Sequence, residues 1–310
     1  MIKFINAKIN IGLNIVCRRP DGYHDLETVF YPVGVMNGTP GNPEPFCDIL
    51  EGCWGVDSGP DPDFSAVGID YFFTGRRIDC PPEKNLVVKA GTLFAEALRR
   101  RGENPNPYIS VTLRKCLPDG AGLGGGSADA SGVLTLLNDL HRSEAGTAPF
   151  TRYELEEMAL KLGADCPVFV ANKPAYAEGV GERLEPVSLD LSGWWCLIAK
   201  PDVYVSTREA FAGVTPRRPD EPLRSLIQLP VEEWRGRIVN DFESSLFPVH
   251  PEFALIKEMM YASGAVYASM SGSGSALYGL YATRDEALAA SETIRRESLQ
   301  TVCTPCLLTN

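Results

Sequence analysis

The sequence predicts an α+β fold of two domains, residues 1–171 and residues 172–310. Apolar residues alternate in some segments, as strands require, and recur with helical spacing in others. This mixture of patterns ends near residue 172 and then begins again. A chain of 310 residues can form one large domain or two ordinary ones, with a sufficient core in either case.

The N-terminal half opens with two predicted strands. The first contains Ile9 and Ile11, and the second runs from Leu26 to Val35. Because Ile9 and Ile11 share one face of their strand, Lys8 and Asn10 share the other face. That second face is either exposed to solvent or part of an active-site cleft.

Residues 37–82 are rich in Pro, Gly and Asp, and we expect this segment to be mostly irregular. Two short pieces of it are strand-like, Cys47–Leu50 and Asp70–Phe73. A further strand is expected after it, where the apolar residues alternate at Ile109, Val111 and Leu113.

Three helices are expected in the same half. One covers residues 84–101, one follows Ser127, and one follows Thr151, which forms a capping-box pattern with Glu154. Gly163 is placed to end the third helix. Their apolar faces are Leu86, Ala90, Leu93, Phe94 and Ala97; Val133, Leu136, Leu137 and Leu140; and Leu155, Met158, Ala159 and Leu162.

The C-terminal half repeats the mixture of strands and helices without internal sequence repeats. The elements expected here are a strand at Trp194–Ala199, a polar and proline-rich stretch around 214–224, a helix at 252–262, strands on both sides of residues 270–276, and a helix from about Asp285.

Composition excludes several classes of function. The net charge of −11 argues against a surface that binds nucleic acid or an anionic membrane. No apolar run is long enough to span a membrane, and the N-terminus has the pattern of a strand rather than of a signal peptide. We therefore expect small-molecule partners, while the protein could be a monomer or a homodimer.

The nine cysteines are odd in number and scattered, which favours a reduced cytoplasmic protein over a disulfide framework. Cys303 and Cys306 have the spacing of half a zinc site, but a second pair is missing. The helix expected after a redox motif of this spacing is missing too. We interpret this pair as incidental.

A glycine-rich segment is the strongest functional signal in the chain. Five of the seven residues from Gly120 to Gly126 are glycine, and a helical pattern follows Ser127. Such a turn directs backbone N–H groups and the positive end of a helix dipole at one point, which is an anion site. The anion expected is a nucleotide phosphate. A flexible linker is the weaker alternative, because linker glycines usually lie among Ser, Asn and charged residues.

Other phosphate-binding patterns fit less well. Gly120, Gly122 and Gly125 match the dinucleotide pattern, but a strand should lead directly into the first glycine, and Pro118 and Asp119 intervene. No Gly-Lys-Ser/Thr sequence ends the turn, so it is not a P-loop. The His-Arg-Asp and Asp-Phe-Gly sequences of protein kinases are also absent.

The string Leu117–Asp129 resembles the second motif of the GHMP small-molecule kinases. Asn6–Ile11 is similar to the first motif of that family, and Met270–Ala276 to the third, a glycine-rich turn that supports the phosphate loop. The resemblance implies an N-terminal βαβ-type ATP-binding domain and a C-terminal ferredoxin-like domain, with the active site between them. It also implies ATP and Mg²⁺ as cofactors.

The resemblance further implies a set of site residues. Asp165 matches the catalytic aspartate, which would accept or orient the proton of the attacking hydroxyl, and Lys8 matches the lysine beside it. Without the resemblance, Asp165 would be interpreted as a capping carboxylate. No metal-ligating residue is assigned, although Ser127 would lie close to the phosphates and the metal. The residues that match ATP-binding positions are Asn85, Lys115, Pro118, Gly120, Gly122, Leu123, Gly124, Gly125, Gly126, Ser127 and Asp129, the last of which is Asn in some relatives.

Four more strings are similar to one branch of the family, which phosphorylates cytidine diphosphate methylerythritol in the non-mevalonate route to isoprenoids. They are Arg19–His24, Leu162–Phe169, Ala177–Glu182 and the segment from Lys200 to Phe211. The implied reaction transfers the γ-phosphate of ATP to the 2-hydroxyl of that alcohol. The implied acceptor-binding residues are Asn10, Tyr23, His24, Thr207 and Phe211, with the aromatic residues at the cytosine.

Two alternatives stay open. The chain could be a GHMP kinase of another small alcohol, such as homoserine, mevalonate or a sugar. It could also be a non-catalytic relative that only binds a nucleotide, but intact Lys8, Asp165 and glycine-rich loop argue against this.

Overall fold

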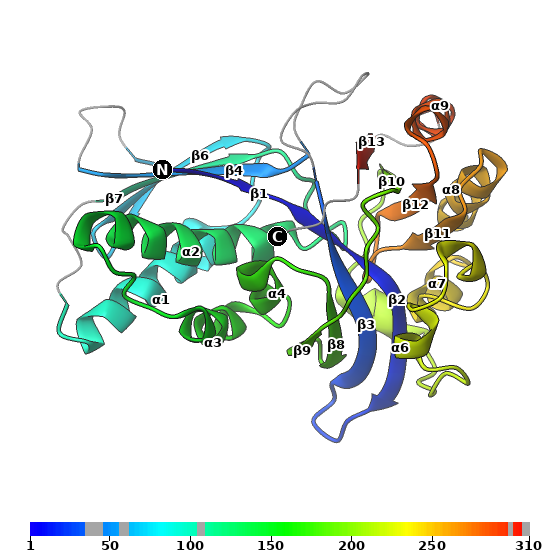
Figure 1. Ribbon diagram of the computed structural model, residues 1–310, viewed down its shortest axis with the longest axis horizontal. Helices are drawn as coiled ribbons and strands as arrows, with labels where there is room; N and C mark the ends of the chain where they lie inside the picture. The colour runs from blue at the N-terminus through cyan, green and yellow to red at the C-terminus, as the bar shows by residue number, and fades with distance from the viewer. Residues whose placement is uncertain (35–45, 56–61, 104–108, 297–299, 306–310) are drawn as a thin grey trace. The chain divides into compact units, whose positions relative to one another are not determined.

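A computed structural model describes residues 1–34, 46–55, 62–103, 109–296 and 300–305, the last of these without side chains (Figure 1). The chain divides into two compact units whose segments alternate along the sequence. Unit 1 consists of Met1–Asn6, Cys47–Asp119 and Gly124–Asn172, and unit 2 of Ala7–Phe46, Gly120–Leu123 and Lys173–Asn310. The predicted domain boundary between residues 171 and 172 stays a prediction. The chain last passes from unit 1 to unit 2 between Asn172 and Lys173.

Unit 1 is a five-stranded sheet with helices, of which α1 and α2 lie along one face of the sheet (Figure 1). The strands pair antiparallel except for β6 and β7, which run parallel. In sheet order they are β1 (Ile2–Ile5), β4 (Asp48–Trp54), β7 (Ile109–Lys115), β6 (Ile69–Gly75) and β5 (Phe64–Ala66). The helices are η1 (Pro82–Lys84), α1 (Leu86–Arg100), α2 (Gly125–Ala145), α3 (Arg152–Leu162) and α4 (Cys166–Ala171).

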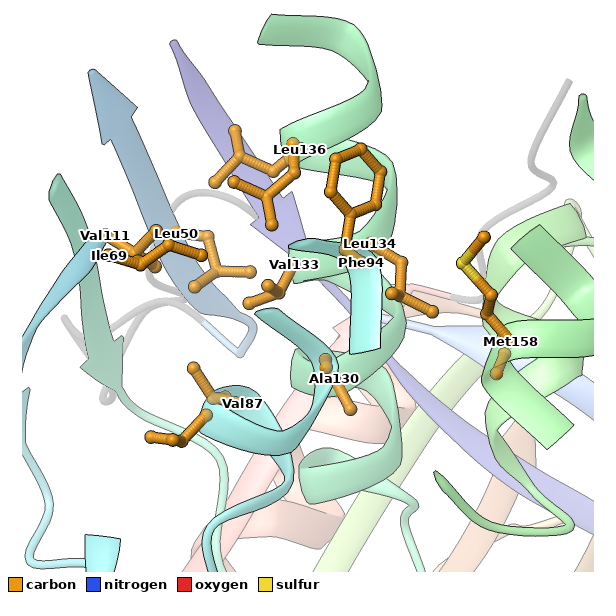
Figure 2. Close-up of a cluster of buried hydrophobic side chains, with 14 of the residues drawn as sticks. Leu50, Ile69, Val87, Phe94, Val111, Ala130, Val133, Leu134, Leu136 and Met158 are labelled. Carbon is orange, nitrogen blue, oxygen red and sulfur yellow. The ribbon is translucent and has the colours of Figure 1, made fainter. Parts of the chain in front are cut away.

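The local signals in this unit are confirmed. Thr151 and Glu154 form both bonds of the capping box of α3, and Gly163 is its C-cap. One core formed by residues of the sheet, α1, α2 and α3 contains the predicted apolar faces, as Figure 2 shows for Leu50 of β4 with Val133 and Leu136 of α2. Because these apolar side chains leave water together, the helices are attached to the sheet by the hydrophobic effect.

The prediction that residues 37–82 are mostly irregular is wrong for the described part of that segment. β4, β5 and β6 lie in it, and β4 extends well beyond the predicted piece Cys47–Leu50. The glycines and aspartates weaken local strand propensity, but pairing with β1 and β7 satisfies the backbone of these strands. Residues 35–45 and 56–61 lie outside the described residues.

Unit 2 contains two four-stranded sheets. The first has the order β2 (Ala7–Arg18), β3 (His24–Val33), β8 (Ala175–Gly179) and β9 (Arg183–Pro186), all antiparallel. The second has the order β11 (Tyr267–Met270), β12 (Leu277–Tyr281), β10 (Trp195–Lys200) and β13 (Gln300–Pro305). The helices are α5 (Thr207–Ala212), α6 (Leu223–Leu226), η2 (Val231–Glu233), α7 (Asp241–Leu246), α8 (Pro251–Ala262) and α9 (Arg284–Ile294).

The second sheet and its helices have the ferredoxin-like arrangement. Apart from the short helices before α8, the chain order is β10–α8–β11–β12–α9–β13, and α8 and α9 pack against the strands and each other. The predicted strand Trp194–Ala199, both helices and the strands around residues 270–276 are confirmed. The side chain of Cys303 and all of Cys306 lie outside the described residues.

Within the described ranges, none of the helices combines the length and the apolarity that crossing a membrane requires.

Candidate active site

Lys8 and Asn10 lie on the same face of β2, as predicted, and both side chains are buried. The Lys8 Nζ donates hydrogen bonds to Oδ1 of Asn10 at 2.5 Å and to the carbonyl of Gly122 at 3.0 Å. It also lies 5.0 Å from the centre of the Phe30 ring. Nδ2 of Asn10 donates to the Thr28 hydroxyl at 3.0 Å. The face is therefore a buried polar site that holds a cation next to the glycine-rich loop.

The second glycine-rich turn supports the part of the loop that belongs to unit 2. The Ser271 hydroxyl donates to the Gly122 carbonyl at 2.9 Å, and Ala276 N–H donates to the Ala121 carbonyl at 3.1 Å. A Cβ atom on Gly122 would lie 2.0 Å from the Ser271 carbonyl oxygen, and its φ is +71°. Glycine is required at this position for both reasons. Nδ2 of Asn240 holds the turn in place by donating to the carbonyls of Met270 and Gly272.

The part of the loop in unit 1 forms the start of α2. Gly124 is the N-cap in the left-handed conformation, and the Ala128 N–H donates the first helical hydrogen bond to its carbonyl at 2.8 Å. The N–H groups of Gly125, Gly126 and Ser127 precede that bond, so they are the donors that a helix leaves for an anion. A Cβ atom on Gly126 would meet nothing within 4 Å. This open space fits a phosphate group close to the backbone.

Asp165 is the N-cap residue of α4, but its side chain makes no capping hydrogen bond there. The next residue, Cys166, links this turn to α2. Its carbonyl accepts a hydrogen bond from the Ser131 hydroxyl at 2.6 Å. Burial raises the pKa of the Cys166 thiol to about 11. Asp165 is half-buried, and the residue that follows it is hydrogen-bonded within unit 1 to α2, the helix that carries Ser127.

Lys115 and Asp129 belong to a buried charged network whose third member, Asp48, sequence reasoning missed. The Lys115 Nζ donates to Oδ2 of Asp48 and to Oδ2 of Asp129, both at 2.7 Å. Burial alone would lower the pKa of Lys115, but Asp129 and Asp48 outweigh it and raise that pKa. Burial raises the pKa of Asp129. No local pattern distinguishes Asp48, because its partner lies 67 residues along the chain.

Asn85 and Pro118, two further predicted ATP-binding residues, lie at the N-terminus of α1 and before the glycine-rich loop. The side chain of Asn85 is buried and accepts a hydrogen bond from the Val87 N–H at 2.9 Å, which caps α1. Pro118 is half-buried at the start of the glycine-rich loop, and Leu123 is buried near its middle.

His24 and Phe211, predicted at one end of an acceptor, lie together in unit 2. Their rings stack with centroids 4.7 Å apart and planes at 18°. Phe211 also contacts Phe242 edge-on at 4.8 Å and packs against the core of unit 2. Tyr23, the residue before His24, is 65% exposed. Thr207 is exposed on the first turn of α5, one turn before Phe211. The tertiary structure therefore joins two distant segments at one aromatic surface.

In the part of the chain that the structure describes, no group of three or more His, Cys, Asp or Glu side chains could hold a metal ion by itself. The Ser127 hydroxyl is a hard oxygen donor in the first turn of α2.

Two family models match the chain. The model described as GHMP kinases N terminal domain matches residues 85–173, and the model described as GHMP kinases C terminal matches residues 224–299.

Curated relatives extend the similarity to nearly the whole chain. It is 46% identical to the 4-diphosphocytidyl-2-C-methyl-D-erythritol kinase of Parabacteroides distasonis, over 91% of this chain and 92% of the relative. Identity is 44% to the Bacteroides fragilis protein of the same name, over 92% and 94%.

Solved structures agree with this. A crystal structure of 4-(cytidine 5'-diphospho)-2C-methyl-D-erythritol kinase matches with a TM-score of 0.75 and 31% identity, covering 98% of each chain. Homoserine kinase from Cytophaga hutchinsonii matches with a TM-score of 0.60 at 17% identity, which shows a common fold alone.

Proposed function

This chain belongs to the GHMP kinase family, whose members use ATP as the phosphate donor, and we propose that it phosphorylates the 2-hydroxyl of 4-diphosphocytidyl-2-C-methyl-D-erythritol. The enzyme would then act in the non-mevalonate route to isoprenoids. The observation that carries the choice of acceptor is the identity of 46% over nine-tenths of the chain with a relative of that name. The aromatic surface formed by His24 and Phe211 supports it, because a cytosine ring stacks on such a surface.

In the proposed reaction, the hydroxyl oxygen of the acceptor attacks the γ-phosphorus of ATP. The bond from that phosphorus to the β,γ-bridging oxygen breaks, ADP leaves, and the hydroxyl proton passes to the Asp165 carboxylate. The position of Asp165 supports this role, since its turn is hydrogen-bonded through the Cys166 carbonyl to the helix that would bind the phosphates.

The glycine-rich loop and Lys8 would stabilise the phosphates and the charge that moves between them. N–H groups at the start of α2 are fixed by the helix before ATP arrives, so they need no reorganisation during transfer. Lys8 is a buried cation that already contacts the loop through the Gly122 carbonyl. We propose that Lys8 and Asp165 act on the same phosphoryl transfer.

Mg²⁺ is part of the proposal. It is a hard ion that prefers oxygen ligands, and it is usually bound through substrate phosphates and one or two protein oxygens. The Ser127 hydroxyl at the start of α2 fits this requirement, and the ion would neutralise charge on the phosphates of ATP. Asn85, Pro118 and Leu123 are proposed to border the nucleotide.

For the acceptor, we propose that the cytosine ring stacks on Phe211. His24 covers one face of Phe211 in the structure, and a ring between them would need a separation of about 7 Å, two aromatic contacts of ~3.5 Å. His24 would therefore move aside and hydrogen-bond the edge of the base. Tyr23 would stack on the outer face of the base, and Asn10 and Thr207 would contact other parts of the acceptor.

A panel of acceptors tests the proposal. ADP formation would be measured with the cytidine diphosphate alcohol, homoserine, mevalonate and a sugar, each with ATP and Mg²⁺. We expect the cytidine substrate to give the highest kcat/KM by a wide margin. A higher value for another alcohol would assign the chain to a different kinase activity, and no ADP with any acceptor would favour a non-catalytic relative. A cytoplasmic location and a monomeric or homodimeric state stay predictions.

A further inference from the structure

The segment that leads from β7 into the glycine-rich loop has its backbone held by two side chains of unit 1. Oδ1 of Asp48 accepts hydrogen bonds from the N–H groups of Cys116 at 2.6 Å and Leu117 at 2.8 Å. Nε of Arg76 donates to the Cys116 carbonyl at 2.8 Å, and the Arg76 N–H donates to the Lys115 carbonyl at 2.8 Å. The entry to the loop is therefore fixed before its first glycine.

The side chain of Lys115 reaches from this entry to the other end of the loop. Its Nζ donates to Asp129 on the second turn of α2, and a Cβ atom on Gly125 would lie only 3.1 Å from it. Oδ2 of Asp48 accepts from the same Nζ at 2.7 Å. One carboxylate oxygen of Asp48 thus holds the backbone at the entry of the loop. The other oxygen binds Lys115, which in turn binds Asp129 at the start of α2.

All three charged side chains of this network are buried, with Asp48 fully inaccessible to solvent. A buried charge is tolerated only where it is paired and hydrogen-bonded, so each member depends on the other two. An exposed carboxylate, that of Asp119, also lies 3.8 Å from the Lys115 Nζ. Such a network allows one arrangement of the chain rather than several.

We infer that Asp48 is a positioning residue for ATP, which acts by holding the entry of the glycine-rich loop and the start of α2 at a fixed spacing through Lys115. Asp48 itself does not touch the nucleotide in this account. The inference depends on the proposed function only in that the loop binds the phosphates of ATP. Because the donors of an anion site must converge on one position, a change in this spacing weakens ATP binding before it affects the acceptor.

The test replaces Asp with Asn at each of the two residues that accept a hydrogen bond from Lys115, Asp48 and Asp129. In the parent, one oxygen of Asp48 accepts from two backbone N–H groups and the other accepts from the Lys115 ammonium. Asp48→Asn keeps only one oxygen, so its NH₂ group must face one of these two sets of donors. Asp129→Asn keeps an oxygen for Lys115, and its NH₂ group can occupy the place of Oδ1, which receives no hydrogen bond from the described residues. Asp139→Asn, on the same helix but paired with Lys3 and Arg142, is the neutral control.

Binding of a non-hydrolysable ATP analogue with Mg²⁺ would be measured by calorimetry, beside thermal melts and the KM values for ATP and acceptor. We expect Asp48→Asn to raise the Kd for the analogue and the KM for ATP by about ten- to a hundredfold, with the acceptor KM within about threefold. Asp129→Asn should raise the Kd by less, and Asp139→Asn should leave it unchanged.

Arg76→Ala keeps the test decisive if Asp48→Asn does not fold. Arg76 is exposed, so its loss leaves no buried charge, and it removes one anchor of the same segment. A higher Kd for the ATP analogue in Arg76→Ala than in the parent supports the inference. If Asp48→Asn melts at a lower temperature but binds the analogue like the parent, or if Arg76→Ala binds normally where Asp48→Asn is unfolded, the role of Asp48 is purely structural. A parent that binds the analogue but phosphorylates no acceptor refutes the proposed function alone.

Discussion

At the scale of single residues, Asp165 is the group whose removal best tests the chemistry. Asp165→Asn is expected to keep ATP binding and to lower turnover by at least about a hundredfold, the usual effect of losing a general base. The side chain makes no capping hydrogen bond to α4, so the amide should not destabilise the helix. Single-turnover kinetics with titrated ATP would measure both quantities. Turnover within a few-fold of the parent would exclude Asp165 as the base.

His24 and Phe211 test the acceptor at the same scale. His24→Ala and Phe211→Ala should each raise the KM for the cytidine substrate by about five- to a hundredfold, since a lost aromatic stack on a base is worth roughly 1–3 kcal/mol. The KM for ATP should change much less. Phe211→Ala should also lower the melting temperature, because Phe211 packs edge-on against Phe242, whereas His24→Ala should not. An equal rise in both KM values would argue against an aromatic cytosine site.

At the scale of elements, two glycines of the loop separate a structural role from a ligand-binding role. Gly122→Ala should lower the melting temperature, because its Cβ atom would lie 2.0 Å from the Ser271 carbonyl oxygen. Gly126→Ala should fold like the parent, because its Cβ atom meets nothing within 4 Å. If phosphates approach Gly126, this variant should bind ATP at least about tenfold more weakly. Normal ATP affinity in Gly126→Ala would place the phosphates elsewhere.

The elements also show which parts of the fold could be predicted. α3 begins and ends as predicted, because its capping box and its terminal glycine are contained in its own sequence. The helix predicted at 252–262 is likewise found at Pro251–Ala262. β4 and β6 were predicted only in part, as the pieces Cys47–Leu50 and Asp70–Phe73, and β5 was missed, because strands that contain Gly and Asp depend on partners from other segments. Local signals thus predicted helices better than strands.

At the scale of the whole molecule, the cysteines test whether the chain is packed as described. Cys17, Cys53 and Cys80 are exposed, while Cys47, Cys116, Cys166 and Cys196 are buried. Iodoacetamide at pH 8 should modify the first group in the native protein and the second only after denaturation, as mass spectrometry of peptides would show. Burial also raises the pKa of Cys47 to about 12, so little reactive thiolate forms there. Modification of Cys166 as fast as of Cys80 would contradict the described core.

Three features could be predicted from the amino-acid sequence alone: the α+β class, the glycine-rich loop before α2, and the shared face of Lys8 and Asn10. Each of these features follows from residues that are close together in the chain. The spacing of their apolar side chains indicates a helix or a strand, and it indicates which side chains share a face. The resemblance to a kinase family also rests on short contiguous strings, so it does not depend on how distant segments pack together.

Three features became evident only in three dimensions: Asp48 pairs with Lys115, His24 stacks on Phe211, and the segments of the two units alternate along the chain. These contacts join residues far apart in sequence, and they form only because burial of apolar surface brings their elements together. A buried carboxylate such as Asp48 has no sequence signal of its own. In the low-dielectric core, a buried carboxylate is stabilised by an ion pair and by hydrogen bonds, and the residues that supply them come from other segments of the chain.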